Sequence, residues 1–177
     1  MIKTEDIKAI LKNSADIVYL DLYIGNDYRS PASLIYIEGL VNADMIDAYI
    51  LKPLTEEIST SCENFDLIEQ ISRGAVYHCA RKAKDSVEEV VSDVLAGNAA
   101  LVIDNLEKSV VFEVKGFQMR SVSEPTAENV VKGAKDSFIE VLRVNTATMR
   151  RRIQSPDLRI EEISVGTKIK TNVAVIY

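Results

Sequence analysis

The sequence has no tryptophan, a single histidine and two cysteines among its 177 residues. Cys62 and Cys79 are too few for the disulfide framework that stabilises small secreted domains, so we expect reduced thiols. The histidine, His78, adjoins Cys79, but Cys62 is distant and the C-x-x-C spacing of tetrahedral zinc sites is missing. These absences exclude the disulfide-rich class, and we expect neither a metal site nor a cofactor.

Long hydrophobic runs are also missing. The longest, Ala99 to Ile103 and Val173 to Tyr177, have about five residues, whereas a membrane-spanning helix needs roughly 20. The start of the chain, Met1 to Asp6, lacks the apolar stretch of a secretory signal. With 47% hydrophobic and 27% charged residues, the composition is that of a globular protein. We therefore expect a folded chain that does not itself cross a bilayer.

Catalytic motifs are absent as well. Nucleophilic catalysis needs a base beside the nucleophile, and His78 is the only histidine available, with no identifiable orienting partner. A partly buried histidine satisfied by a neighbour is the simpler interpretation. The sequence has no G-x-S-x-G, Walker or G-x-G-x-x-G motif. Adjacent acids such as Glu56-Glu57 or Glu161-Glu162 point in different directions on a helix or strand, so solvated surface explains them better than catalysis. We predict that the chain is not an enzyme.

The formal net charge is −6, which disfavours binding to nucleic acid. The charge is uneven: residues 1–118 hold 11 Lys and Arg against 20 Asp and Glu, and residues 119–177 hold 10 against 7. The chain therefore has an acidic part followed by a mildly basic part.

Hydrophobic periodicity in the first part alternates between helical and extended patterns. We expect helices over Glu5 to Lys12 (capped by Thr4), Ala43 to Leu51 (stopped by Pro53) and Asp85 to Leu95. We expect strands over Ile17 to Ile24, Ser33 to Ile37, Ala99 to Asp104 and Ser109 to Lys115, the last two forming a hairpin. This order indicates an α/β (α+β) fold, with helices packed on a mixed sheet.

In the second part, a short helix is expected to begin at Pro125 and to end at Gly133. The longest helix is predicted over Lys135 to Ile153, with Phe138 on its apolar face. Two strands, Leu158 to Ser164 and Lys168 to Ile176, flank a turn at Gly166. Because the chain stops at Tyr177 within an apolar strand, we expect it to be part of a longer protein and to self-associate through that strand.

Three consecutive arginines end the long helix. Arg150, Arg151 and Arg152 exceed what a helix dipole needs, and successive residues fan across about 200°, so at least one should point inward to a carboxylate. We predict an ion-pair network of these arginines with Arg120, Glu124, Glu128 and Glu140. An interface with an acidic partner or with anionic headgroups is the alternative. The turn at Gly133 could also hold an anion, although a plain turn between helices explains it more simply.

Several segments resemble the A subunit of Ger-type spore germinant receptors. The residues that carry the resemblance are Arg120-Ser121-Val122-Ser123-Glu124-Pro125-Thr126-Ala127-Glu128-Asn129-Val130-Val131-Lys132-Gly133, Phe138-Ile139-Glu140, Asn145-Thr146, Arg150-Arg151-Arg152-Ile153 and Gly166-Thr167-Lys168-Ile169-Lys170-Thr171. A looser similarity covers Leu34 to Leu40 and Gly97 to Asp104.

This resemblance implies the soluble N-terminal region of a membrane protein of endospore-forming bacteria. Such a region would lie on the cytosolic (core) side of the spore inner membrane, and would act with B and C subunits and other A subunits in nutrient-triggered germination, without enzymatic activity. Two α/β subdomains are implied. The change of charge near residue 118 divides them into 1–118 and 119–177, the second truncated before the membrane region. A sporulation paralogue shares these motifs. A small-molecule binding domain, with nutrient or anion between the subdomains, remains the alternative.

Overall fold

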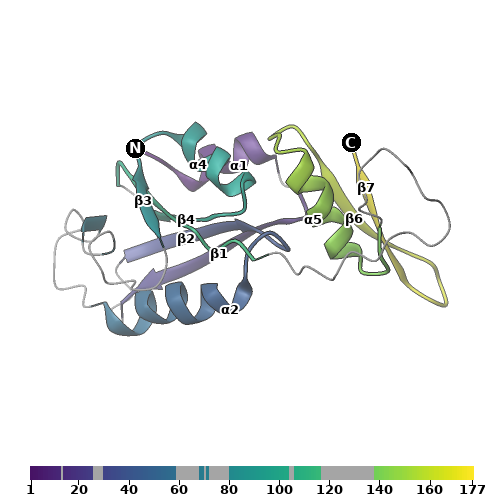
Figure 1. Ribbon diagram of the computed structural model, residues 1–177, viewed down its shortest axis with the longest axis horizontal. Helices are drawn as coiled ribbons and strands as arrows, with labels where there is room; N and C mark the ends of the chain where they lie inside the picture. Colours follow the sequence, from purple (N-terminus) through teal and green to yellow (C-terminus); the bar gives the residue numbers. More distant parts are fainter. Residues whose placement is uncertain are drawn as a thin grey trace, which may run out of the picture.

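The computed structural model describes residues 1–12, 14–25, 30–58, 68–69, 71, 80–103, 106–116 and 138–177 (Figure 1). Several residues singled out in the sequence lie outside these ranges. They are Cys62, His78, Cys79, Arg120, Glu124, Pro125, Glu128 and Gly133. The short helix expected at Pro125, the turn at Gly133 and the boundary at residue 118 also fall outside the described residues and stay predictions.

A five-stranded sheet forms the centre of the larger part of the molecule. Its order is β1 (Ile17–Ile24), β2 (Ser30–Ile37), β4 (Ala99–Ile103), β5 (Ser109–Phe112) and β3 (Arg81–Lys84). The predicted α/β class is confirmed, as are the strands at β1, β2, β4 and β5. Every pair in this sheet is antiparallel, so the mixed strand directions that we expected are not found among the described strands. The short strand β3, rich in lysine and arginine, was not foreseen.

Helices cover both faces of this sheet (Figure 1). On one face lie α1 (Thr4–Leu11) and α4 (Val87–Leu95). On the other lies a continuous helical run made of α2 (Ala43–Ile46), η1 (Asp47–Leu51) and η2 (Pro53–Glu57). The central strand β4 is buried along its whole length because both of its faces are covered, which explains its uninterrupted apolar sequence.

Two helix boundaries differ from the prediction. Pro53 does not stop the helix: Lys52 before it is helical, and the run continues past Pro53 with the π-type turns of η2. Thr4 does not cap α1. Lys3 is the N-cap, without a side-chain hydrogen bond, and Thr4 lies inside the first turn, where it is buried on the same face as Leu11.

The second part contains one helix, α5 (Leu142–Arg152), and a two-stranded antiparallel sheet of β6 (Ile160–Val165) and β7 (Thr171–Ile176) among its described residues. The two predicted strands are confirmed. The long helix begins later than predicted, at Leu142, and Phe138 is 66% exposed. The cause is Asn145, whose side chain accepts a hydrogen bond from the Ile139 N–H (2.8 Å) and donates one to the Ile139 carbonyl (2.6 Å). These bonds fold residues 138–140 back onto the helix.

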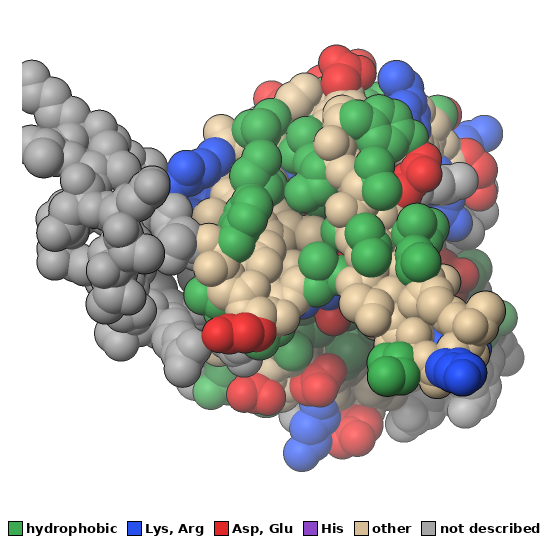
Figure 2. Space-filling model, turned by 90° about the vertical axis from the view of Figure 1, so that its right-hand side faces the viewer, with side chains coloured by type: hydrophobic (Ala, Val, Ile, Leu, Met, Phe, Trp, Pro, Cys, Tyr) green, Lys and Arg blue, Asp and Glu red, His purple; other side chains and the backbone are tan. Residues whose placement is uncertain are grey.

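One face of the β6–β7 sheet packs toward α5 and the other is open. Ile160 is buried on the covered face, and Glu162 on the same face pairs with Arg143 of α5. The open face carries exposed apolar side chains, which Figure 2 shows gathered on this end of the molecule. They are Ile163, Val165, Val173, Val175 and Tyr177.

Candidate functional site

Arg150, near the end of α5, is the largest fully buried side chain among the described residues and is 1% exposed. Its guanidinium forms a bidentate pair with Asp16, with Nε 2.8 Å from Oδ2 and Nη2 3.0 Å from Oδ1. Nη2 also donates to the Ser14 hydroxyl at 3.0 Å. Nη1 donates to the carbonyls of Ser155 (3.2 Å) and Leu158 (3.1 Å). These bonds use all five guanidinium N–H donors, so the buried charge is fully hydrogen-bonded.

The side-chain partners of Arg150, Asp16 and Ser14, come from the segment between α1 and β1. Asp16 is 1% exposed and Ser14 is 5% exposed. The same segment pairs with the start of β6, because Ile160 donates its N–H to the Ser14 hydroxyl (2.9 Å) and its carbonyl accepts the Ala15 N–H (2.8 Å). We call this contact of residues 14–16 with Arg150 and Ile160 the junction. It connects the part built on the five-stranded sheet to the part built on β6 and β7.

Asp16 also affects a tyrosine on β1. Burial, and secondarily the negative charge of Asp16, raise the pKa of Tyr19 to about 12. The buried Tyr19 hydroxyl has no hydrogen-bond partner among the described residues. The ammonium of Lys8 lies 5.0 Å from the centre of the Tyr19 ring.

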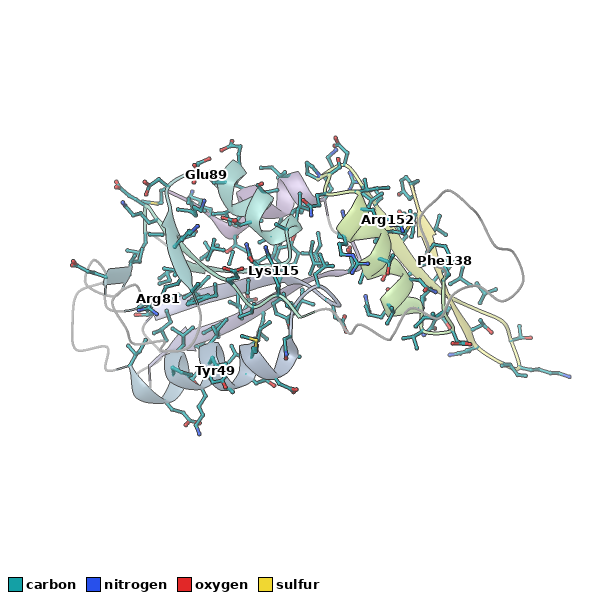
Figure 3. The ribbon with its side chains drawn as sticks, in the orientation of Figure 1. Tyr49, Arg81, Glu89, Lys115, Phe138 and Arg152 are labelled. Carbon is teal, nitrogen blue, oxygen red and sulfur yellow. The ribbon has the colours of Figure 1, made fainter. Side chains whose placement is uncertain are left out.

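The structure assigns different positions to the three arginines. Arg150 points inward and pairs with a carboxylate, as predicted, but that carboxylate is Asp16, which was not among the predicted partners. Arg151 is half-buried and Arg152 is exposed, at the end of α5 seen in Figure 3. The predicted network with Arg120, Glu124 and Glu128 stays a prediction, because those three residues lie outside the described ranges. The only sequence signal for Asp16 was a charged residue directly before an apolar strand.

The other predicted residues are distributed over α5 and the β6–β7 hairpin. Asn145 holds residue 139 at the start of α5. Phe138 (Figure 3) is exposed in the segment before that helix. Glu140 in the same segment is exposed as well. Gly166 lies in the hairpin turn with φ +112°, and Thr171 begins β7. The junction therefore brings together Arg150 and Ser14–Asp16, whereas the remaining motif residues occupy separate places.

A second contact between the two parts lies beside the junction. Arg143 of α5 bridges Glu38, at 3.1 Å, and Glu162 of β6, at 3.0 Å. Gly39 follows Glu38 with φ +87°, and a Cβ built there would lie 2.9 Å from the Cβ of Ala147. A glycine is therefore required both for the backbone conformation and for the close approach of α5.

A cavity of about 540 Å³ opens next to this contact. Its wall comes from the turn after β2, from the start of α2 and from α5. The residues with charged or polar side chains that line it are Glu38, Asn42, Asp44, Arg143, Thr148 and Arg151. Both signs of charge thus face the same space, which suits a small polar molecule.

Two further features are absent from the described residues. No three histidine, cysteine, aspartate or glutamate side chains converge as a metal ion would require. No described helix has the length and apolar character needed to cross a membrane.

Comparison with known proteins identifies the family. Residues 5–177 match the family described as Bacillus/Clostridium GerA spore germination protein. The chain is 32% identical over 173 residues to spore germination protein B1 of Bacillus subtilis (strain 168), covering 98% of this chain and 35% of that protein. It is 30% identical over 173 residues to the uncharacterized membrane protein YfkQ of the same organism, covering 98% of this chain and 33% of that protein. The chain thus spans about a third of the length of these relatives.

A solved structure is similar over nearly the whole chain. It is the crystal structure of the N-terminal domain of the A subunit of the Bacillus megaterium spore germinant receptor GerK3, with a TM-score of 0.75 and 26% identity. The alignment covers 98% of this chain and 62% of that domain chain. The chain therefore belongs to the GerA family of spore germination proteins, and is similar to the N-terminal domain of a receptor A subunit.

Proposed function

We propose that this chain acts in spore germination as the N-terminal, cytosolic part of a germinant receptor A subunit, in which it assembles subunits and transmits the nutrient signal. The observation that carries the proposal is the family match over residues 5–177, together with the similarity to the GerK3 A-subunit domain. The role is one of binding and transmission, without a chemical reaction.

The junction supplies a physical means of transmission. Arg150 is held by five hydrogen bonds that reach both residues 14–16 and the segment before β6. α5 cannot move relative to residues 14–16 without breaking the bonds of Arg150 to Asp16 and Ser14, which would leave a buried charge unpaired. We propose that the chain works as two α/β subdomains, divided near residue 118, that the junction couples.

The proposal extends to the surroundings of the chain. We place it on the core side of the spore inner membrane, in contact with B and C subunits of the receptor and with other A subunits. The family match and the relatives' names support this placement.

The test is complementation in spores that lack the corresponding gene. Asp16→Ala should abolish or strongly slow the response to nutrients, whereas germination by a stimulus that bypasses nutrient receptors should be unchanged. Asp6→Ala, which removes an exposed carboxylate of α1, is the matched control. Normal nutrient germination with Asp16→Ala, in spores that contain the variant protein at the normal level, would contradict a signalling role for the junction. Normal germination of the deletion strain would contradict the proposed function itself.

A second function is favoured by the cavity beside the junction. We propose, as the alternative, that it binds a small polar nutrient or an anion between the two parts, with Arg143 and Asn42 supplying polar contacts. Thermal unfolding with candidate nutrients tests this, since a ligand at 100 times its Kd adds about 2.7 kcal/mol to the stability. Thr148→Trp, which would fill the cavity from α5, should remove the stabilisation. A ligand that stabilises wild type and variant equally binds elsewhere.

A further inference from the structure

The tip of the β6–β7 hairpin has features that the proposed function does not use. Residues 166–170 connect the strands and are all exposed, and the hairpin extends to the far end of the long axis of the molecule (Figure 1). Ile169 in this tip is 80% exposed, the highest value among the exposed large hydrophobic side chains of the described residues. The turn needs a residue with a positive φ, and Gly166, with φ +112°, supplies it. Folding therefore gives no reason for an isoleucine at this position.

Two lysines flank the exposed isoleucine. Lys168 and Lys170 are exposed, and no ion pair or hydrogen bond to either of them is found in the described part of the chain. Residues 138–177 as a whole carry seven Lys and Arg against four Asp and Glu. Val165, half exposed at the end of β6, continues the apolar surface toward the open face of the hairpin. The tip thus presents an aliphatic side chain between two unpaired cations.

We propose that this tip docks onto the surface of an anionic lipid bilayer. Ile169 enters the region between headgroups and acyl chains, and Lys168 and Lys170 lie at the lipid phosphates. An acidic protein surface would attract the lysines as well, but a bilayer also provides an apolar layer directly below the negative charges, which matches the lysine-isoleucine-lysine order. Each lysine close to such a surface strengthens binding roughly fivefold. This inference does not depend on which nutrient the proposed receptor senses.

The test uses the absence of tryptophan from the chain. Ile169→Trp places a single fluorescent reporter at the tip. Tyr49→Trp places one on the helical run at the other end of the molecule (Figure 3) as the matched control. On vesicles of phosphatidylglycerol and phosphatidylcholine, we expect a blue shift and quenching by brominated acyl chains for Ile169→Trp alone. The signal should disappear at high salt and on pure phosphatidylcholine vesicles.

The contributions of the lysines and of the isoleucine to vesicle binding are then measured separately, in the chain without a tryptophan. Vesicle sedimentation of Lys168→Ser/Lys170→Ser should show binding weakened roughly 30-fold, and Ile169→Ser should also weaken it. Lys52→Ser/Lys82→Ser removes two exposed lysines elsewhere and should bind as wild type does.

An Ile169→Trp emission unchanged by anionic vesicles would overturn the proposal. Equal binding by the two double variants would overturn it as well, and so would binding to polyglutamate without binding to vesicles, which indicates an acidic protein partner.

Discussion

At the scale of single residues, the decisive feature is a buried charge whose hydrogen-bonding capacity is fully used. Burying an arginine is costly unless it is paired, and Asp16, Ser14 and two carbonyls satisfy every donor of Arg150. Lysine has three donors on a single nitrogen and cannot reproduce the forked geometry. The requirement at this position is therefore for arginine itself and not only for a positive charge.

The first prediction concerns this pair. Asp16→Ala should lower the free energy of unfolding by about 3–5 kcal/mol, because it leaves Arg150 buried without a counter-charge. Replacing both partners, as Asp16→Leu/Arg150→Met, should cost less than the sum of the single changes. Urea denaturation measures each variant. Arg152→Ala, on the exposed side of the same helix, should cost less than about 1 kcal/mol. Additive effects in the double variant would contradict a coupled buried pair.

The second prediction follows from Tyr19. Its pKa is about 12 in the folded chain, against 10.0 for an ordinary tyrosine. Below pH 10.0 the hydroxyl is protonated in both states. Between pH 10.0 and about 12 the unfolded chain loses this proton first, so the stability falls as the pH rises through that window. Tyr19→Phe removes this contribution and should flatten the loss, measured as the urea midpoint across the same range. An unchanged pH dependence in Tyr19→Phe would show that Tyr19 ionises equally in both states.

At the scale of elements, the position of α5 depends on two local devices. Asn145 fixes the segment before the helix by hydrogen bonds to both backbone groups of Ile139, so the helix begins at Leu142. Gly39 lets the helix approach the turn after β2 more closely than any side chain would allow. The close approach at Gly39 thereby shapes the cavity, whose wall includes both Gly39 and Ala147.

The third prediction tests the close approach at Gly39. Gly39→Ala should destabilise the fold by about 1–3 kcal/mol, because alanine is strained at φ +87° and its Cβ would lie 2.9 Å from that of Ala147. Adding Ala147→Gly should relieve the contact between the two side chains but not the backbone strain. Thermal unfolding of both single variants and of the double variant separates the two costs. A double variant whose loss equals the sum of the single losses would show that the contact with Ala147 carries none of the cost.

At the scale of the whole molecule, the two sheets differ in how completely they are covered. The five-stranded sheet has helices on both faces, whereas the β6–β7 sheet has α5 on one face and exposed apolar side chains on the other. The outer edge of β7 pairs with no other strand among the described residues. Unpaired edges and open apolar faces promote association.

The fourth prediction is that the chain self-associates through β7. The backbones of Tyr177 and Arg159 form two hydrogen bonds with each other. In an antiparallel pair, residues with such bonds alternate with residues whose N–H points outward, so the N–H of Asn172 points away from β6. Asn172→Pro should remove an outward donor without breaking the hairpin and should shift the chain toward the monomer. Sedimentation velocity at several concentrations measures this, with Asn172→Ala as the control. A wild-type chain that is monomeric throughout the concentration range would refute the exposed-edge argument.

Local patterns were sufficient to predict most of the regular elements. Alternating side chains over Ile17–Ile24, the fully apolar run at Ala99–Ile103 and the glycine turn between β6 and β7 each depend on a few neighbouring residues. The strands at these positions were therefore expected from the sequence. The motif segments were likewise sufficient for the family, because a resemblance depends on residue order and not on contacts.

The pairing of Arg150 with Asp16 was decided only by the tertiary structure. The two residues are separated by 134 positions, and no periodicity or spacing connects them. The same holds for the start of α5, where a side chain six residues away displaced a continuous helical pattern, and for Pro53, where helical packing on the sheet continued past a residue that usually ends a helix. The pair of Arg150 and Asp16 exists only after distant segments have met. At Pro53 a local preference of proline against helix, about 3 kcal/mol, is opposed by the packing of the helical run on the sheet, which the local sequence does not reveal.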